Sequence, residues 1–280
     1  GVIELLDLTL SEYLRANISA KGYNPADFTC FSYGGAGPVH TYGYTEGVGF
    51  KDVVVPAWAA GFSAFGCASA EFEYRYDKSL DINLDPDAGD DERSAAAQVL
   101  HAAWTELAEK VVAEFVLNGY QADQVILRPG FRMQYRGQLN DLEIDAPIPD
   151  ATTAEHWDHL VNAFETTYAR VYAKAAGSPE LGFSVTGAIM RGLVTTVKPH
   201  IPEEPLGEDT PPAAASRGTR PFYRHGTWHD AAIWHMEALA PGSEIVGPAI
   251  IESDETTFVV PEGYTTCLDG HRLFHLRRAH

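Results

Sequence analysis

A glycine-rich run behind a short apolar segment is the sequence feature best suited to hold a ligand. Residues 28–33 read as a buried strand, and four small residues separate them from Pro38: Gly34, Gly35, Ala36 and Gly37. Glycine lets the backbone approach a ligand closely, and a helix that begins near Pro38 would offer free amides and a partial positive charge. This arrangement suits a phosphate or an adenosine. The spacing matches neither the dinucleotide fingerprint nor the phosphate loop, so the pattern alone favours a structural turn.

Two groups of histidines have spacings that could hold a metal ion. His156 and His159 lie three residues apart on an expected helix and could share one face. The second group has one parity in an expected β region and could face one side of a sheet: His225, His229 and His235. The first pair has no companion cysteine or carboxylate that completes a tetrahedral set, and the strand limits around the second group are undefined. Surface or capping roles are therefore favoured, and no metal site is expected.

Other reactive side chains do not form a recognisable catalytic set. Ser63 and Cys67 lie among small residues without an assigned base, so both are expected to be packing residues. A polar cluster could bind a carboxylate or phosphate, or pair with acidic neighbours: Arg132, Tyr135, Arg136 and Gln138. The acidic stretch at 81–92 lacks the register of a calcium loop and is predicted to be a solvated loop. No catalytic base is assigned.

The charge of the chain limits its partners. The 280 residues contain 20 Lys and Arg against 39 Asp and Glu, a formal net charge of −19. Such acidity repels phosphate backbones and anionic lipid, so we expect neither a nucleic-acid nor a membrane-surface role. Any anionic ligand must be held by a local site, such as backbone amides or a bound cation.

Cysteine usage and hydropathy indicate a cytoplasmic protein. Cys30, Cys67 and Cys267 are odd in number and far apart, so no disulfide framework is expected. No stretch approaches about 18 consecutive apolar residues, and the N-terminal residues lack a signal-peptide pattern. The chain starts within a helical pattern that has no preceding cap, as expected of a piece that begins in mid-fold.

The hydrophobic pattern predicts the elements that must position these residues. The first part reads as helix 2–20, strand 28–33, helix 39–46, strand 52–56 and a small-residue helix or turn over 61–71, a βαβ-like order. The middle reads as helix 94–118, strands 124–128, 131–135 and 142–144, a helix with a capping box of Thr152 and Glu155, and a strand or hairpin over 181–198. After a linker-like stretch over 202–216, short strands are expected at 220–224, 227–233, 249–253 and 256–260.

These elements divide the chain into three expected parts. They are an α/β domain over 1–80, an α+β domain over 81–201 and a β-rich C-terminal module over 202–280. The overall fold class is therefore α/β and α+β.

Five motifs, in order, resemble the hydantoinase A/5-oxoprolinase family. They lie at residues 32–40, 61–66, 135–138, 239–252 and 257–264. The first reads Ser-Tyr-Gly-Gly-Ala-Gly-Pro-Val-His, and the third reads Tyr-Arg-Gly-Gln. Tyr33 before the glycines and the run from Cys67 to Glu71 depart from the commoner hydrolase pattern and look closer to the ketone carboxylase branch.

The resemblance implies an ATP-dependent enzyme that works as part of a complex. Residues 1–80 would be the C-terminal part of an actin-like or heat-shock-70-like ATPase domain, with Gly34, Gly35, Ala36 and Gly37 on the nucleotide and Mg²⁺ on its phosphates. The family's N-terminal Asp-x-Gly-Gly-Thr motif is missing from this chain. The resemblance therefore also implies an N-terminal hydantoinase A-like chain or half, and a hydantoinase B-like subunit.

Three functions follow from the resemblance. The first is a subunit or C-terminal half of an ATP-dependent ketone carboxylase, in which ATP activates the enolate oxygen or bicarbonate. The second is an ATP-dependent amidohydrolase that cleaves a cyclic amide such as a hydantoin or 5-oxoproline. The third is a noncatalytic scaffold subunit of such a complex, with a degenerate nucleotide site.

Overall fold

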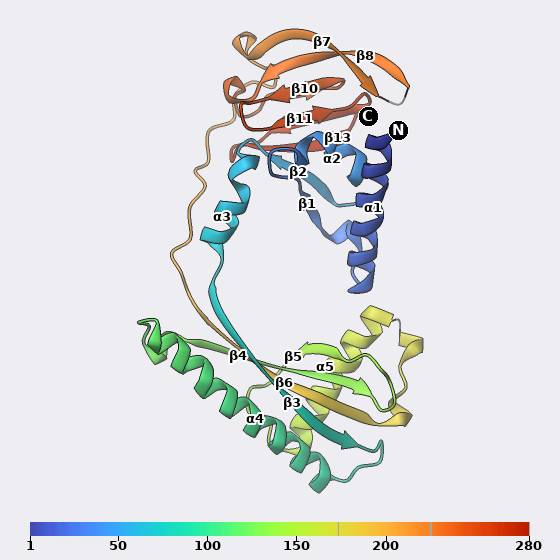
Figure 1. The fold of residues 1–280 in the computed structure, drawn as a ribbon, viewed down its shortest axis with the longest axis vertical. Coiled ribbons are helices and arrows are strands. Elements are labelled where there is room, and N and C mark those ends of the chain that lie inside the picture. The colour runs from blue at the N-terminus through green and yellow to red at the C-terminus, as the bar shows by residue number, and fades with distance from the viewer. Residues whose placement is uncertain (173, 225, 280) are drawn as a thin grey trace. The chain divides into compact units, whose positions relative to one another are not determined.

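The computed structural model describes residues 1–172, 174–224 and 226–279, and these form two compact units (Figure 1). Unit 1 combines residues 1–69 with residues 198–280, and unit 2 consists of residues 70–197. This division differs from the three parts expected at 1–80, 81–201 and 202–280. The first and last of those parts share one sheet, a long-range pairing that local sequence patterns do not report.

The first sheet of unit 1 joins the two ends of the chain. Its strands are, in sheet order, β1 (Thr29–Phe31), β2 (Asp52–Pro56), β13 (Leu273–Arg278), β12 (Tyr264–Leu268) and β9 (Glu244–Val246). β1 and β2 are parallel and are connected through helix α2 (Gly37–Thr45), so the predicted βαβ order is confirmed. β13 pairs antiparallel with β2, whereas β9, β12 and β13 were not predicted.

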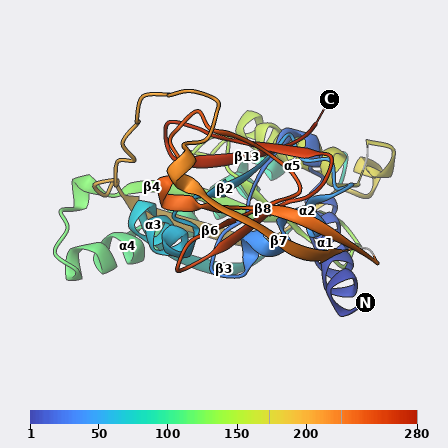
Figure 2. The same ribbon diagram turned by 90° about the horizontal axis from the view of Figure 1, so that it is seen from above.

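The second sheet of unit 1 contains the four strands that the sequence predicts near the C-terminus. Its order is β11 (Thr257–Val260), β10 (Ala249–Glu252), β8 (Thr227–His235) and β7 (Ser216–Arg224). Side chains from both sheets form one core, which includes Val55, Ile251, Phe258 and Phe274. Strands β7 and β8 of this sheet are labelled in the view from above (Figure 2). Residues 202–215 are irregular apart from a short 3₁₀ turn, and the Glu204 N–H donates to the Gly270 carbonyl at 2.7 Å.

Helix α1 (Val2–Ala20) has the predicted length, but its buried face is rotated away from the predicted apolar stripe, of which only Leu14 and Ile18 are partly buried. Its buried residues are the polar Asp7 and Ser11, whereas Val2, Ile3 and Leu5 are 87%, 63% and 65% exposed. The face toward α2 is narrow and polar because α2 presents His40 and Gly43 there. An apolar surface of α1 is left uncovered by the described residues.

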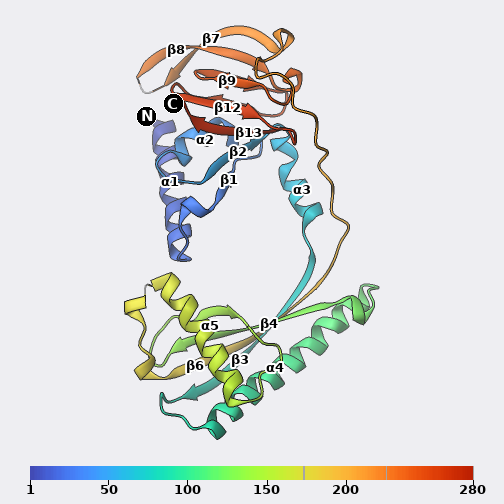
Figure 3. The ribbon, with the colours of Figure 1, turned by 180° about the vertical axis from the view of Figure 1, so that it is seen from behind.

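Unit 2 is an antiparallel sheet with two long helices on one face (Figure 3). The sheet order is β3 (Phe72–Leu84), β6 (Phe183–Val194), β4 (Ile126–Tyr135) and β5 (Leu142–Asp145). Helices α4 (Asp90–Leu117) and α5 (Ala154–Tyr172) pack against each other and against this face, and their apolar stripes are buried as predicted. Apolar periodicity therefore located both helices correctly.

Three local predictions in unit 2 are wrong. The stretch 81–92, expected to be a solvated loop, contributes its first four residues to β3, which was not predicted, and its last three to α4. The strands expected at 124–128 and 131–135 are one strand, because Pro129 and Gly130 continue the pairing with Met190 and Ile189 of β6. The predicted capping box is replaced by Thr153, whose Oγ1 accepts the His156 N–H at 3.2 Å. Within the described residues, no helix combines the length and apolar composition needed to cross a membrane.

Candidate functional site

The glycine-rich turn connects β1 to α2 and is held at its base by buried side chains. Ser32 continues the pairing of β1 by donating its N–H to the Val54 carbonyl at 2.8 Å. The Ser32 hydroxyl accepts a hydrogen bond of 2.6 Å from Thr41 in α2, and both residues are buried. The end of the strand and the first turns of the helix are therefore linked, and the chain between them must make a tight turn.

The turn directs two successive carbonyls toward one hydroxyl. Gly34 has φ +88°, a conformation that strongly favours glycine, and its N–H donates to the Ala59 carbonyl at 2.8 Å. The Thr256 hydroxyl lies 3.1 Å from the Gly34 carbonyl and 3.0 Å from the Gly35 carbonyl. In a trans peptide the N–H points away from the carbonyl of the preceding residue. The amides of Gly35 and Ala36 therefore point away from Thr256, and both residues are exposed.

Helix α2 adds its positive end to this turn. It begins at Gly37, and Ala36 occupies the N-cap position without a side-chain cap. Pro38 has no N–H, and the Val39 N–H donates to the Ala36 carbonyl at 3.2 Å, so α2 adds the Gly37 amide and the partial positive charge of its first turn, which favours an anion. The start predicted near Pro38 is therefore correct, and the amides of the turn and helix together can hold a phosphate without a lysine.

Thr256 is the contact that the sequence analysis missed. It lies 221 residues from Gly35 along the chain, in the loop between β10 and β11. Ser253 shapes this loop, because its hydroxyl accepts the N–H groups of Glu255 and Thr256 at 3.2 and 3.1 Å. The backbone carbonyl of Glu255 lies 3.4 Å from the place where a Cβ on Gly35 would sit. Neither segment contains a local sequence pattern that predicts this close contact between the loop and the turn.

Exposed aromatic rings lie next to the turn. Phe31 and Tyr33 are 41% and 46% exposed, and both contact Phe62 at the start of α3 (Phe62–Ser69), with ring centroids 5.4 and 4.8 Å away. Trp58 extends the cluster with its centroid 5.3 Å from that of Phe62. Aromatic faces of this kind suit a flat ring or an apolar partner.

Comparison with known families identifies the family of the chain that carries this turn. Residues 87–279 match the hydantoinase/oxoprolinase C-terminal domain, and residues 1–76 match hydantoinase/oxoprolinase. The chain belongs to the hydantoinase/oxoprolinase family. The resemblance carried by the five sequence motifs is thus confirmed.

Relatives within this family are ATP-dependent carboxylase and lactamase components. The acetone carboxylase beta subunit of Xanthobacter autotrophicus is 67% identical over 277 residues, which are 99% of this chain and 39% of the relative. The acetophenone carboxylase gamma subunit of Aromatoleum aromaticum is 30% identical over 272 residues, 96% of this chain and 36% of the relative. The chain thus spans well under half the length of these relatives.

Two solved structures share the fold of this family member. A nucleotide-free structure of acetone carboxylase has a TM-score of 0.74 and 66% identity, and covers 100% of this chain and 39% of that one. The ATP-dependent caprolactamase from Pseudomonas jessenii has a TM-score of 0.83 and 24% identity, and covers 100% and 40%. The predicted fold class, α/β and α+β with part of an actin-like ATPase-type fold, is confirmed.

The described members of the two histidine groups make separate contacts in this family member. His156 accepts the Thr152 N–H through Nδ1 at 3.1 Å, which is a local capping contact. His229 and His235 pair separately with Glu262 and Glu237, at 3.4 and 3.0 Å. Among the residues that the structure describes, no three His, Cys, Asp or Glu side chains are placed to hold a metal ion. His225, the third member of the second group, lies outside the described residues.

The two nucleophile candidates are not packing residues. Ser63 and Cys67 both lie on α3 and are exposed, and α3 has no buried residue. The expectation that they pack in a core was wrong, because α3 presents its small side chains outward in the described chain. Cys67, Cys30 and Cys267 are all free thiols, and burial raises the pKa of the Cys30 thiol to about 11.

The polar cluster at the end of β4 pairs with acidic neighbours, which was one of its two predicted roles. Arg132 donates to Asp77 at 2.6 Å, and Arg136 pairs with Asp85. Gln138 donates to the Tyr168 hydroxyl at 2.9 Å. These side chains are therefore engaged in contacts within unit 2.

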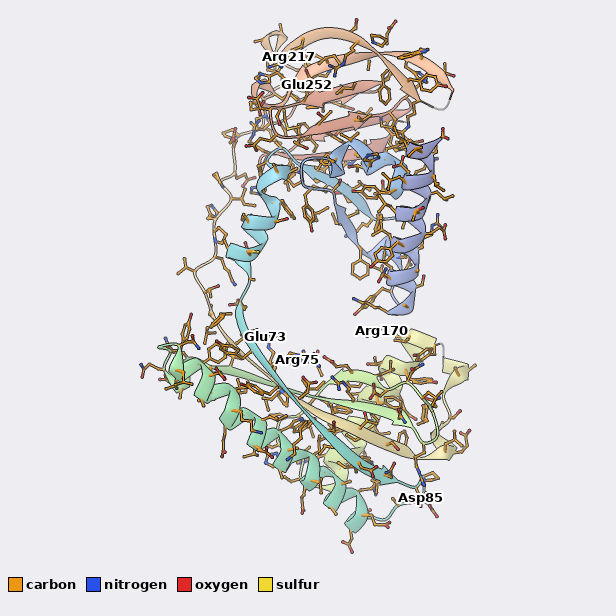
Figure 4. All side chains as sticks on the ribbon, in the orientation of Figure 1. Glu73, Arg75, Asp85, Arg170, Arg217 and Glu252 are labelled. Atoms are coloured by element: carbon orange, nitrogen blue, oxygen red, sulfur yellow. The ribbon has the colours of Figure 1, made fainter. Side chains whose placement is uncertain are left out.

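Arg75 on β3 organises a wider ionic network on the face of the unit 2 sheet opposite the helices (Figure 4). Its guanidinium bonds Asp77 at 2.9 Å and Glu143 at 2.7 and 3.0 Å. Arg191 joins Glu143 at 2.6 Å, so the charges alternate. Hydrogen bonds from Arg75 lower the pKa of both Asp77 and Glu143. Charge pairing thus occupies the sheet face that the described helices of unit 2 leave uncovered.

Proposed function

We propose that this chain is a subunit, or the C-terminal half, of an ATP-dependent ketone carboxylase, and that it contributes nucleotide binding and phosphoryl activation. The observation that carries the proposal is the turn in which Thr256 holds the Gly34 and Gly35 carbonyls, so that the following amides face outward. The 67% identity to the acetone carboxylase beta subunit supports the choice of reaction class.

The residues of the turn fit a nucleotide. Gly34, Gly35, Ala36 and Gly37 leave their backbone open, and an added Cβ on Gly34 would meet nothing within 4 Å. The outward amides and the start of α2 would bind phosphate oxygens, and the exposed rings of Phe31 and Tyr33 offer a surface for the base. ATP supplies the phosphoryl group that activates the enolate oxygen or bicarbonate.

In this proposal Mg²⁺ is bound by the phosphates, and the described part of the chain offers no ready-made set of ligands for it. The described residues contain no cluster of three metal-binding side chains. The formal charge of −19 opposes an approaching polyphosphate, so a bound cation would reduce this repulsion. The remaining ligands would come from the phosphates themselves and from the partner chain.

The partners we infer are an N-terminal hydantoinase A-like chain or half and a hydantoinase B-like subunit. Two uncovered apolar surfaces support such partners. On α1, Leu6 and Leu10 lie four residues apart on one face and are 44% and 36% exposed, and α3 has no buried residue. Contiguous apolar exposure of this kind marks an interaction surface. A cytoplasmic location is part of the proposal and is supported by the free thiols of the chain.

A fluorescent ATP analogue tests the nucleotide site in the assembled complex. Gly35→Val inserts a side chain against the Glu255 carbonyl and over the outward amides, without requiring a positive φ. We expect binding to weaken by about 10-fold or more, a loss of about 1.4 kcal/mol. Gly89→Ala in unit 2, where an added Cβ meets nothing within 4 Å, is the matched control. Equal binding by Gly35→Val and the wild type overturns the nucleotide site, and a scaffold role then follows.

A cyclic amide hydrolase is the second candidate function. The caprolactamase subunit alpha of Pseudomonas jessenii is 25% identical over 285 residues, 100% of this chain and 39% of the relative. In this alternative, ATP activates the amide carbonyl and water completes the cleavage. The complex is assayed for ATP turnover with a ketone and labelled bicarbonate, and in parallel with a hydantoin or 5-oxoproline. Turnover that depends only on the cyclic amide selects the hydrolase.

A further inference from the structure

A cavity of about 380 Å³ lies in unit 1 beside the first turns of α1 and α2. The ends of β7 and β11 complete its wall. The lining is mainly apolar and includes Ile3, Val39, Phe222 and Val259. Its polar side includes His40, with Asp7 and Arg224 next to it. A concave apolar pocket with a few convergent polar groups is the usual form of a small-molecule site.

His40 and Asp7 form a carboxylate–imidazole pair at this cavity. His40 Nδ1 lies 3.0 Å from Asp7 Oδ1. Asp7 is only 7% exposed, although it belongs to a surface helix. When Nδ1 carries the proton and donates it to the carboxylate, Nε2 is left with a lone pair. In the part of the chain that the structure describes, Nε2 has no hydrogen-bond partner.

The fold places Asp7 under His40 through a close helix contact. Gly43 follows His40 by less than one turn of α2, and a Cβ on Gly43 would overlap the Asp7 carboxylate. Arg224 lies 3.9 Å from the other oxygen of Asp7 and stacks over the Tyr42 ring, with its Cζ 4.3 Å from the centroid. Burying a carboxylate is costly unless it is paired, and here both partners line the cavity. The arrangement orients the His40 ring and fixes its tautomer.

We propose that this cavity binds a small molecule with an apolar body and a carbonyl group, and that His40, positioned by Asp7, transfers a proton to or from it. The inference rests on the proposed function and names the substrate pocket. α2 begins at the nucleotide turn and carries His40 as its fourth residue, so one short helix connects the two sites. The apolar lining suits a ketone better than a charged substrate.

The proton transfer can be written for a ketone. The Nε2 lone pair takes a proton from the carbon next to the carbonyl, and the electron pair of that C–H bond becomes the C=C bond of an enolate. The carbonyl oxygen then carries the negative charge and accepts the terminal phosphoryl group of ATP, with ADP as the leaving group. The proton rests on the imidazolium, which the Asp7 carboxylate stabilises.

Protection from diethyl pyrocarbonate tests the cavity without relying on activity. The reagent modifies an unprotonated imidazole nitrogen, and peptide mass spectrometry reads each histidine of the intact complex separately. We expect acetone or acetophenone to reduce modification of His40 but not of His159, which is exposed in unit 2. The same protection experiment is repeated with a cyclic amide in place of the ketone. Protection by either compound supports the cavity, and equal modification of His40 with and without both compounds overturns it.

Variants of the pair test the proton transfer. His40→Ala should lower kcat by about 100-fold or more, the usual contribution of a general base. Free imidazole should restore part of this activity, whereas it should not rescue Gly35→Val. Asp7→Asn should lower kcat while the KM for ketone stays unchanged, because the residue positions the base. His159→Ala is the matched control.

Measuring nucleotide binding distinguishes failure of the proposed function from failure of the role of His40. Both variants should bind the ATP analogue as the wild type does, which also reports that they are folded. If wild-type complex uses neither ketone nor cyclic amide with ATP, the proposed function fails and the protection experiment decides the cavity. If activity exists but His40→Ala retains it, or if imidazole gives no rescue while nucleotide binding is intact, the role of His40 is overturned.

Discussion

Trp104 on α4 provides a sharp test of how unit 2 is held together. Its side chain is 2% exposed, and its indole N–H donates to the Gly130 carbonyl of the central strand β4 at 2.7 Å. Trp104→Phe keeps an aromatic ring but removes the donor. The buried carbonyl left without this donor costs about 1 to 3 kcal/mol, and the lost ring leaves a cavity that adds about 1 kcal/mol. We expect unfolding free energy to fall by about 2 to 4 kcal/mol.

The measurement is urea unfolding of the full chain, followed by circular dichroism at about 222 nm, where the helices of unit 2 contribute strongly. Trp157→Phe is the matched control. Trp157 is also 2% exposed, and this substitution removes the same part of a buried indole. Within the described residues, its indole N–H has no hydrogen-bond partner. Trp228→Phe, at a residue 67% exposed, should have almost no effect. If Trp104→Phe costs no more than Trp157→Phe, the hydrogen bond to Gly130 contributes nothing and the reasoning is refuted.

Two further predictions concern the ionic network and the loop that supports the turn. Because Arg75 lowers the pKa of Asp77 and Glu143, the network stabilises the native state above the ordinary carboxyl range near about 4 and loses this contribution as pH falls through the lowered values. The difference in urea midpoint between wild type and Asp77→Asn should therefore shrink between roughly pH 6 and pH 3, and a constant difference contradicts the assignment. Thr256→Val removes the hydroxyl held by two glycine carbonyls and should weaken ATP-analogue binding by about 3- to 10-fold, the value of one hydrogen bond. Thr210→Val, at an exposed position, should leave binding unchanged, and an identical response of both variants removes Thr256 from the site.

Local patterns were sufficient where an element's own side chains decide its structure. The apolar spacing in α4 and α5 predicted which residues would be buried, and Leu100, Leu160 and Phe164 are fully buried. The turn after β1 was predicted from Gly34 to Pro38 because glycine and proline restrict the backbone locally. Periodicity failed for α1, since it reports an apolar face but not whether a partner covers it.

The candidate site shows the same limit of local patterns, which do not report contacts with distant segments. Gly34 to Gly37 were identifiable as an open turn, but a structural turn and a ligand site have the same local signature. Thr256 holds two carbonyls from 221 and 222 residues away, and this contact shows where the amides point, whereas the ligand role of the turn stays a prediction. The His40 pair was likewise hidden, because Asp7 lies 33 residues earlier and reads as an ordinary polar position of a helix.

By itself, the sequence determined the helices, most of the strands, the acidic surface and the family, because these depend on composition, short-range spacing and ordered motifs. Only the tertiary structure decided that the two ends of the chain form one unit, since β2 and β13 pair through backbone hydrogen bonds that carry no local sequence signal. It also decided which carbonyls of the glycine turn are held and that a buried carboxylate lies under His40. Both depend on the close approach of distant segments, at Thr256 and at Gly43, where packing rather than local preference sets the geometry.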